Sequence, residues 1–315
     1  MQLGLIGLGR MGGNMRDRLR TAGHEVIGYD PRPDVSDVDS LEALAKALNA
    51  PRVVWVMVPS GEPTRSTVRA LADVLETGDL VIDGGNSRYT DDRPNAALLD
   101  EKGIGYLDVG VSGGIWGKAN GYGLMAGGAP EHVERAMPIF DALRPEGPRE
   151  EGFVHAGPVG AGHFSKMVHN GIEYGLMQAY AEGYELLSAA DLITNVPGVL
   201  QAWSRGTVVR SWLLDLLVVA LKEDPRLASL EDYVEDSGEG RWTIEEAIKH
   251  AVPLPVISAA LFARFASRQD VSPAMKAVAA LRHQFGGHAV KSAAGPSGVP
   301  GEHAGPSSGT GSTQG

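Results

Sequence analysis

The stretch Gly7-Leu8-Gly9-Arg10-Met11-Gly12 decides the fold of this chain, because it joins a short apolar run, Leu3–Ile6, to a helical pattern, Met11–Ala22. Three glycines at this spacing between a strand and a helix are typical of a dinucleotide-binding turn. The first permits the tight turn, the second lets the backbone approach a pyrophosphate, and the third lets helix and strand pack closely. A glycine-rich turn without a ligand is the alternative. Strand, helix and spacing together favour a pyrophosphate on the helix N-terminus, where free N–H groups attract anions.

Short apolar runs alternate with helical patterns from this turn to about residue 155. The runs typical of strands are Leu3–Ile6, Val26–Tyr29, Val53–Val58, Leu80–Asp83 and Tyr106–Val111, and the helical patterns between them are Met11–Ala22, Leu41–Leu48, Thr64–Leu75 and Arg93–Glu101. This alternation predicts a doubly wound parallel sheet of the Rossmann type.

The second half of the chain carries long helical patterns, namely Phe164–Ala190, Val199–Arg205 and Ser211–Leu221. We therefore expect an α/β Rossmann domain over residues 1–158, followed by an all-α domain for substrate binding and dimerisation over residues 159–290. Residues 291–315 are rich in Gly, Ser, Pro and Ala and show no periodicity. Such a tail buries too little apolar surface to offset its chain entropy, so we expect it to be disordered.

Composition excludes several classes of protein. The 315 residues include no cysteine, which rules out disulfides, thiol catalysis and zinc sites built on thiolates. A net charge of −11 argues against nucleic acid as a partner, whereas a phosphorylated small molecule needs only two or three local cations. No apolar run approaches the roughly 18 residues of a membrane span, and the N-terminus lacks a secretory signal. We expect a cytoplasmic protein without a membrane partner.

Asp30 ends the second predicted strand, at the place where dinucleotide-binding domains carry an acidic residue. Its carboxylate would accept hydrogen bonds from the adenosine ribose and would repel a 2′-phosphate, so it favours NAD over NADP. Arg32 could accommodate that phosphate, which leaves NADP open, and a solvated aspartate at a strand end is the alternative interpretation.

Lys166, His169, Asn170 and Glu173 stand at positions i, i+3, i+4 and i+7 of one helical pattern. At 3.6 residues per turn they fall within about 100° of arc, on one helix face. A solvated charged stripe is the alternative. The glycines before this helix and the mixture of one base, one acid and two hydrogen-bonding groups favour a catalytic face.

These residue types suit the oxidation of a secondary alcohol. A lysine can remove the hydroxyl proton if burial or a helix N-terminus lowers its pKa, and Lys166 lies near the start of its helix. Once protonated, it could polarise the new carbonyl so that CO2 leaves, and a neutral Glu173 could then protonate the enediol on carbon. We expect no metal, because the lysine would act on the carbonyl in place of a Lewis acid.

The run Gly162–Tyr174 resembles the signature of the 6-phosphogluconate dehydrogenases. Further matches follow in the expected order over about residues 1–290: Gly7–Asn14, Val58–Gly61, Ile82–Ser87, Gly110–Gly114, Gly240–Thr243 and Phe262–Arg264. This resemblance implies oxidative decarboxylation of 6-phospho-D-gluconate to D-ribulose 5-phosphate and CO2 with reduction of NAD, in the pentose phosphate pathway.

The resemblance also implies roles for individual residues. Lys166 would be the general base and Glu173 the general acid, and Val58, Pro59 and Asn86 would join the glycine turn at the cofactor. The residues expected to hold the sugar acid are Asn86, Ser112, Gly113, Gly114, His169, Asn170, Tyr174, Arg264, Arg282 and His288. Among these, Tyr174 and Arg264 would contact the phosphate. Arg282 and His288 would come from a partner subunit, so a homodimer or homotetramer is expected.

The chain departs from longer members of the family at three points. Ile115-Trp116-Gly117 replaces residues that are commonly acidic, and Ser237 replaces a lysine aimed at the phosphate, a loss that Arg241 or Arg268 could compensate. The chain is also shorter than the animal-type enzyme. Together with Asp30, these departures point to the short, NAD-preferring bacterial branch.

Two rival functions remain at this point. Another β-hydroxyacid dehydrogenase, such as a 3-hydroxyisobutyrate type, would share the glycine turn but would not decarboxylate; it would not be expected to carry the His169–Tyr174 block or the Phe262–Arg268 helix. A protein that binds NAD without turnover is the second rival, and the intact Lys166 and Glu173 argue against it.

Overall fold

The computed structural model describes residues 1–286 and 289–291. It divides into two units, Met1–Arg268 and a second that begins at Gln269, and each is described by itself. The described helix of the second unit is α12 (Pro273–Gly286). The predicted tail lies outside the described residues except for Lys291. Among the described helices, none has both the length and the apolar character needed to cross a membrane.

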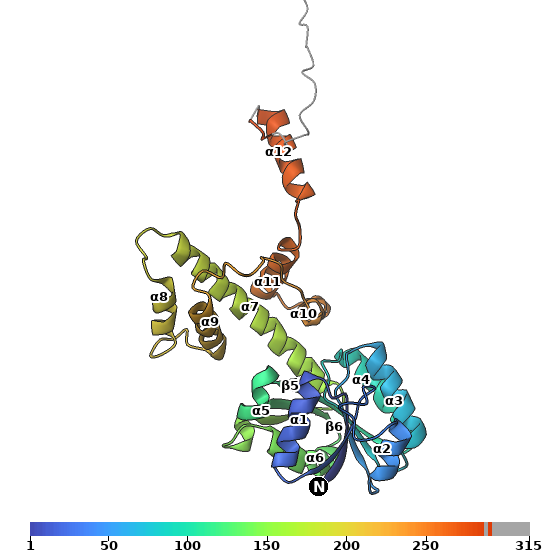
Figure 1. Ribbon diagram of the computed structural model, residues 1–315. Helices are drawn as coiled ribbons and strands as arrows, with labels where there is room; N and C mark the ends of the chain where they lie inside the picture. Colours follow the sequence, from blue (N-terminus) through green and yellow to red (C-terminus); the bar gives the residue numbers. More distant parts are fainter. Residues whose placement is uncertain (287–288, 292–315) are drawn as a thin grey trace, which may run out of the picture. The chain divides into compact units, whose positions relative to one another are not determined.

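A seven-stranded sheet organises the first half of the chain (Figure 1). Its strands, in the order β2-β1-β3-β4-β5-β6-β7, are β1 (Gln2–Ile6), β2 (Glu25–Tyr29), β3 (Val53–Val56), β4 (Leu80–Asp83), β5 (Gly105–Ser112), β6 (Gly123–Gly128) and β7 (Phe153–Gly157). The predicted Rossmann-type sheet is confirmed, since β1 to β5 pair in parallel. Strand β6, which was not predicted, runs antiparallel to β5. The connection between them holds only η1 (Gly114–Trp116) and α5 (Gly117–Asn120), too little chain for a parallel crossover.

Helices cover both faces of this sheet (Figure 1). One face carries α1 (Arg10–Thr21) and α6 (Pro130–Leu143), and the other carries α2 (Leu41–Ala47), α3 (Glu62–Val74) and α4 (Tyr89–Asp100). Alternating side chains of the strands supply both cores: Val53 and Trp55 pack on the α1 side, whereas Val54 and Val56 pack on the α3 side. Strands buried on both faces read as continuous apolar runs, which explains why the sequence predicted them well.

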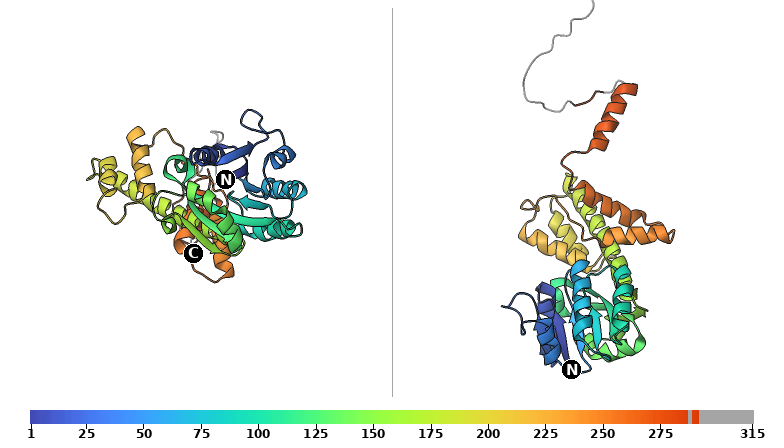
Figure 2. Two further views of the ribbon diagram at one scale, coloured as in Figure 1. Left: turned by 90° about the horizontal axis from the view of Figure 1, so that it is seen from below. Right: turned by 90° about the vertical axis from the view of Figure 1, so that its right-hand side faces the viewer.

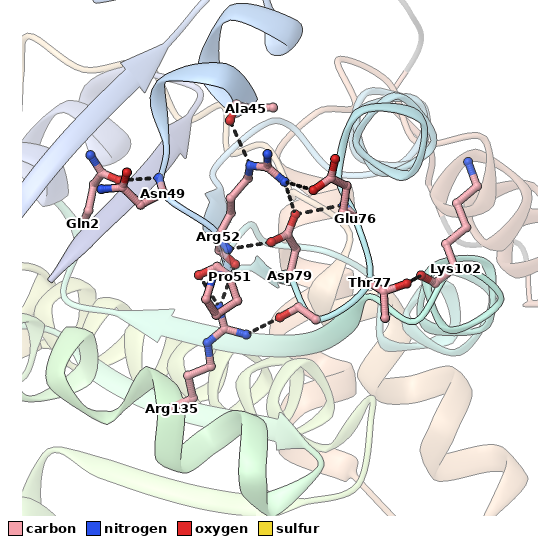
Figure 3. A network of polar contacts seen from close by, with 11 residues as sticks. Gln2, Ala45, Asn49, Pro51, Arg52, Glu76, Thr77, Asp79, Lys102 and Arg135 are labelled. Carbon is pink, nitrogen blue, oxygen red and sulfur yellow. Dashed lines mark hydrogen bonds and ion pairs between the residues drawn. The ribbon is translucent and has the colours of Figure 1, made fainter.

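A polar network ties together the amino ends of the strands (Figure 3). Arg52 donates to Asp79 at 2.9 Å, forming an ion pair in which the Asp79 side chain is only 1% exposed. Arg135 of α6 donates to the carbonyls of Gly78 and Pro51 at 2.6 and 2.7 Å. This edge of the sheet is therefore closed by the protein's own groups, and the opposite edge, at the carboxyl ends of the strands, is the one available to a ligand.

The helical part begins with α7 (Ala161–Ala189), whose 29 residues extend about 44 Å. The shorter helices that follow are α8 (Val196–Trp203), α9 (Trp212–Glu223), α10 (Glu239–Lys249) and α11 (Pro255–Ala266). Figure 2 shows α8 and α9 on one flank of α7 and α10 and α11 on another. The three predicted helical patterns are confirmed with shifted ends, while α10 was not predicted as a separate helix.

Candidate functional site

Each of the three glycines of the opening turn has a distinct environment. Gly7 adopts φ +88°, and a Cβ there would lie 2.5 Å from the Met57 carbonyl oxygen. A Cβ on Gly12 would overlap the carbonyl oxygen of Gly7, so the protein's own packing requires both glycines. At Gly9 no atom lies within 4 Å of the Cβ position. The chain therefore leaves open the one position of the three at which a pyrophosphate would approach the N-terminus of α1, so the turn fits the expected dinucleotide.

Asp30 directly follows β2 and accepts a hydrogen bond from the backbone N–H of Leu8 at 2.8 Å, within the glycine turn. The Arg32 side chain donates to the same carboxylate at 2.9 Å. Hydrogen bonds from Arg32 lower the pKa of Asp30 to about 2, so the carboxylate is ionised at neutral pH. An ionised acid at this position accepts from ribose hydroxyls and repels a 2′-phosphate. Arg32 is the counter-ion of that acid here, which limits its availability to a phosphate.

The other predicted cofactor residues lie at the carboxyl edge of the same sheet. Arg10 and Met11 open α1, Val58 and Pro59 follow β3, and Asn86 follows β4. Pro59 and Asn86 are exposed, and the carbonyl of Pro59 accepts a hydrogen bond from Thr64 of α3 at 2.9 Å. All of these loops lie beside the glycine turn because the strands that carry them run parallel.

The first turn of α7 packs directly on β5 and β6. A Cβ on Gly110 would lie 2.5 Å from Cβ of Lys166, and one on Gly162 would overlap backbone of β6. The buried carboxylate of Asp108 accepts hydrogen bonds from the backbone N–H groups of Gly160 and His163, at 2.7 and 2.9 Å, and so caps the helix. These contacts bring Lys166 to the carboxyl half of β5, next to Ser112.

Four predicted site residues form one hydrogen-bonded cluster. Lys166 Nζ donates to Asn170 Oδ1 at 2.5 Å and lies 3.4 Å from His169 Nδ1. The other ring nitrogen of His169 lies 3.2 Å from Ser112 Oγ. Glu173 Oε2 lies 3.8 Å from His169 Nδ1, one turn further along the helix. The predicted helix face thus exists, and it joins the end of β5 through the bond between Ser112 and His169.

Burial lowers the pKa of the Lys166 ammonium, and the carboxylates of Glu173 and Glu239 offset this only in part. Burial also lowers the pKa of His169, and the neighbouring Lys166 lowers it further. A lowered pKa increases the fraction of lysine present as the neutral amine. Such an amine is suited to accept a proton when an amide oxygen holds it in place. The contacts and the direction of the pKa shift therefore make Lys166 the candidate base of the cluster.

The residues predicted for a phosphate lie further along α7. The Arg264 guanidinium stacks on the ring of Tyr174 at 3.5 Å, and the Tyr174 hydroxyl accepts a hydrogen bond from the Ser237 backbone at 3.4 Å. Arg241 and Arg268, the suggested replacements for the missing lysine, both donate to Asp236, at 2.9 and 2.8 Å, and the Asp236 side chain is 3% exposed. That acidic residue was not predicted, and nothing in the sequence pattern distinguished it from its acidic neighbours.

Two of the predicted substrate-binding residues, Arg282 and His288, lie near the C-terminus. Arg282 lies on α12, in the second unit. His288 lies outside the described residues. Their predicted contribution to a neighbouring subunit's site stays a prediction.

A cavity of about 550 Å³ lies beside the hydrogen-bonded cluster. Ser112, Gly113 and His169 form part of its wall, together with Trp116 of η1 and Trp212 of α9. Gly114, the last residue of the predicted Ser-Gly-Gly loop, is exposed and adopts φ +52°. Trp116, from the loop Ile115-Trp116-Gly117, therefore places an indole in this wall.

Comparison with protein families agrees with this arrangement. Residues 2–145 match the model of the NAD binding domain of 6-phosphogluconate dehydrogenase. Residues 162–293 match the model of the 6-phosphogluconate dehydrogenase C-terminal domain. A relative from Haloferax volcanii, named an NAD(+)-dependent, decarboxylating 6-phosphogluconate dehydrogenase, is 39% identical over 92% of this chain and 98% of its own length.

The chain belongs to the 6-phosphogluconate dehydrogenase family.

Members of this family differ in length. The chain is 35% identical to a Bacillus subtilis NAD(+)-dependent, decarboxylating 6-phosphogluconate dehydrogenase over 84% of this chain but spans only 61% of that relative. Among solved structures, Plasmodium falciparum 6-phosphogluconate dehydrogenase, studied with NADP+ and with 6-phosphogluconate, superimposes with a TM-score of 0.78 at 27% identity. That match covers 91% of this chain and 65% of the longer one. The predicted short branch of the family is consistent with these lengths.

Proposed function

We propose that this family member oxidises 6-phospho-D-gluconate with NAD and releases CO2, giving D-ribulose 5-phosphate and NADH. The observation that carries the proposal is the cluster of Lys166, His169, Asn170 and Ser112, with Glu173 one turn beyond it. The names of the two NAD(+)-dependent, decarboxylating relatives support the same reaction. NAD is the expected oxidant because of the ionised Asp30, and NADP remains an outcome of the test.

The chain's own residues account for each proton in the reaction. NAD, when bound, accepts the hydride from the alcohol carbon. Lys166, as the free amine, takes the hydroxyl proton, and Asn170 holds the lysine in place at 2.5 Å. The protonated Lys166 then returns that proton to the carbonyl oxygen while the bond to the carboxylate breaks and its electron pair forms the enediol. Glu173 protonates the enediol on carbon while Lys166, again the free amine, takes the proton of the enediol hydroxyl, which leaves the ketone product.

In this proposal, different site residues bind different groups of the substrate. Ser112 and His169, which lie 3.2 Å apart, bind hydroxyls, together with Asn86, Gly113 and Gly114. Arg264, stacked on Tyr174, binds the phosphate, for which a guanidinium fork is well shaped.

The proposal extends to architecture. We expect a dinucleotide-binding domain over 1–158 and a helical domain over 159–290, and the two family matches fall on either side of this boundary. Leu186, Leu192 and Phe262 are 73%, 83% and 60% exposed, so the helical part presents large apolar side chains that a second subunit would cover. A homo-oligomer is therefore proposed, and light scattering coupled to size-exclusion chromatography would test it. The cytoplasmic location stays a prediction.

A steady-state assay with 6-phosphogluconate tests the reaction. NAD and NADP are supplied separately, and reduced cofactor and CO2 are measured together. Equal amounts of both products, formed faster with NAD, would support the proposal. Reduction without CO2 would favour the 3-hydroxyisobutyrate-type rival, and no turnover would contradict the proposal.

Lys166→Met tests the base. Loss of a general base lowers turnover by about 10²–10⁴-fold, while NAD binding should stay near that of the wild type. Lys249→Met is the matched control, because Lys249 is an exposed lysine whose ion pair among the described residues is with Glu246 on its own helix. Turnover of Lys166→Met at the level of this control would refute the assignment.

A further inference from the structure

A chain of buried polar side chains lies between the sheet and the first turn of α7. Ser87 donates to Asp83 at 2.8 Å, and the Tyr106 hydroxyl lies 3.4 Å from Asp83 and 2.9 Å from Asp92. Asp92 in turn lies 2.9 Å from Nδ1 of His163. The exposed fraction of each of these five residues is 6% or less. Such a network is costly to bury unless its polar groups are satisfied.

The charges of this network favour an ion pair between Asp92 and His163. Burial by itself opposes a protonated imidazole, but the Asp92 carboxylate outweighs it and the pKa of His163 is raised to about 10. The other groups that face His163 are Asp83 at the end of β4, Tyr106 and Asp108 of β5. Burial raises the pKa of Asp92 to about 7. Because the pKa of His163 lies above that of Asp92, the proton of the pair resides on the imidazole, so we treat the pair as imidazolium and carboxylate.

The network connects the two halves of the candidate site. Asp83 accepts a hydrogen bond from the backbone N–H of Gly85 at 3.0 Å, which fixes the loop that carries Asn86. His163 precedes Lys166 by one turn of α7, and Asp92 comes from α4, a third element. The pair therefore holds α7 against the element that follows the Asn86 loop. Of the hydrogen bonds among the described residues, none runs directly from His163 or Asp92 to Lys166, so any effect on catalysis must come through position.

Asp83, Asp92 and His163 also offer ligand atoms within 4.8 Å of one another, as a metal site would. Asp92 already accepts from both Tyr106 and His163 at 2.9 Å, and Asp83 accepts from Ser87 and Gly85. An ion would have to replace these bonds. The existing contacts favour a hydrogen-bonded ion pair.

We propose that the buried pair of Asp92 and His163 is a positioning pair, which keeps the first turn of α7, and with it Lys166, in register with the loop that carries Asn86. The catalytic part of this inference rests on the proposed function of Lys166. Removing one partner of a buried pair leaves the other charge without compensation, so the register of the helix and the loop should relax when the pair is broken.

The test compares Asp92→Asn with Asp79→Asn. Both remove a carboxylate that is at most 1% exposed and that pairs with a cation at 2.9 Å, but Asp79 lies at the opposite edge of the sheet. Both variants should melt at lower temperature. Only Asp92→Asn should lower kcat, by about tenfold to a hundredfold, and change the pH profile of kcat, with the KM for NAD nearly unchanged. The double variant Asp92→Asn/His163→Gln, which restores a neutral hydrogen bond, should recover part of kcat.

An unchanged kcat and pH profile in Asp92→Asn, or equal losses of kcat in the two single variants, would overturn the positioning role. Amide hydrogen exchange makes the test independent of the reaction. Exchange in the first two turns of α7 and in the Asn86 loop should accelerate in Asp92→Asn but not in Asp79→Asn, whether or not 6-phosphogluconate is the substrate. Unchanged exchange in both segments would overturn the inference even if the proposed reaction is correct.

The wild-type protein offers a measurement that requires no variant. Nitrogen NMR of the His163 ring should show both nitrogens protonated at pH 7, without response to added Zn2+ or Mg2+. A neutral ring at pH 7, or a metal-induced shift, would refute the ion pair.

Discussion

The contact between Gly110 and Lys166 makes a quantitative prediction for Gly110→Ala. The added Cβ would lie 2.5 Å from Cβ of Lys166 and 2.8 Å from the carbonyl oxygen of Gly162. Carbon atoms pack at about 3.5–4.0 Å, so the first turn of α7 must move away from β5 by about 1 Å.

Two consequences of that displacement can be measured. Overpacking of this kind destabilises a protein by about 1–3 kcal/mol. Misplacing a catalytic group by about 1 Å can lower its rate about 10²-fold. We therefore expect Gly110→Ala to fold with a lower melting temperature, to bind NADH with nearly wild-type affinity, and to lose about two orders of magnitude in kcat.

Gly183→Ala is the matched control, because Gly183 lies on the same helix and no atom lies within 4 Å of its Cβ position. It should keep its activity and gain up to about 1 kcal/mol in stability, as expected for alanine in a helix interior. Calorimetry, NADH fluorescence titration and steady-state kinetics on both variants would decide. Wild-type kcat in Gly110→Ala, or a loss confined to NADH binding, would refute the claim that this contact positions Lys166.

Three further predictions follow from the contacts described above. Gly9→Ala should keep its melting temperature and lose NADH affinity, whereas Gly12→Ala, whose Cβ overlaps backbone, should lose stability; equal melting temperatures would contradict this. Asp30→Ala removes the charge-assisted hydrogen bonds to the ribose of NAD, worth about 1.5–3 kcal/mol. It should lower the ratio of kcat/KM with NAD to kcat/KM with NADP by about tenfold or more. An unchanged ratio would show that another residue selects the cofactor. Hydrogen bonds from Arg241 and then from Arg268 lower the pKa of Asp236 to about 2 in the folded protein, compared with about 3.9 in the unfolded chain. The ionised carboxylate therefore stabilises the fold fully above about pH 3.9, and this contribution disappears as the pH falls to about 2. Melting curves should therefore separate Asp236→Asn from the wild type at pH 7 and converge near pH 2, and a difference that persists in acid would contradict the sign of the effect.

Local patterns predicted the first five strands and the helix face that carries the candidate site. Val53–Val56 is buried on both sides and contains only apolar residues, so its run is visible without any long-range information. Lys166, His169, Asn170 and Glu173 belong to a single helix, and helical spacing alone places them together. For the same reason, the glycine turn could be interpreted from six consecutive residues.

Features that depend on distant segments were missed. The strand β6 (Gly123–Gly128) contains three glycines in six residues, so it lacks the β-branched side chains that mark a strand, and its pairing with β5 stabilises it. Asp92 and His163 meet across 71 residues of sequence, and no local pattern connects them. Arg241 and Arg268 were considered as phosphate ligands because they are cationic, and only the structure shows that both bind Asp236.

The start of α7 on the sheet has a consequence for recombining members of this family. The two family models leave a gap between residues 145 and 162, which looks like a natural junction for a chimera. A junction there would pair Asp108 and Gly110 from one parent with Gly162 and Lys166 from the other, and these residues pack so closely that a Cβ on either glycine would clash. Exchange of helical halves should therefore preserve turnover only when the crossover lies beyond Tyr174, so that strand and helix turn are inherited together.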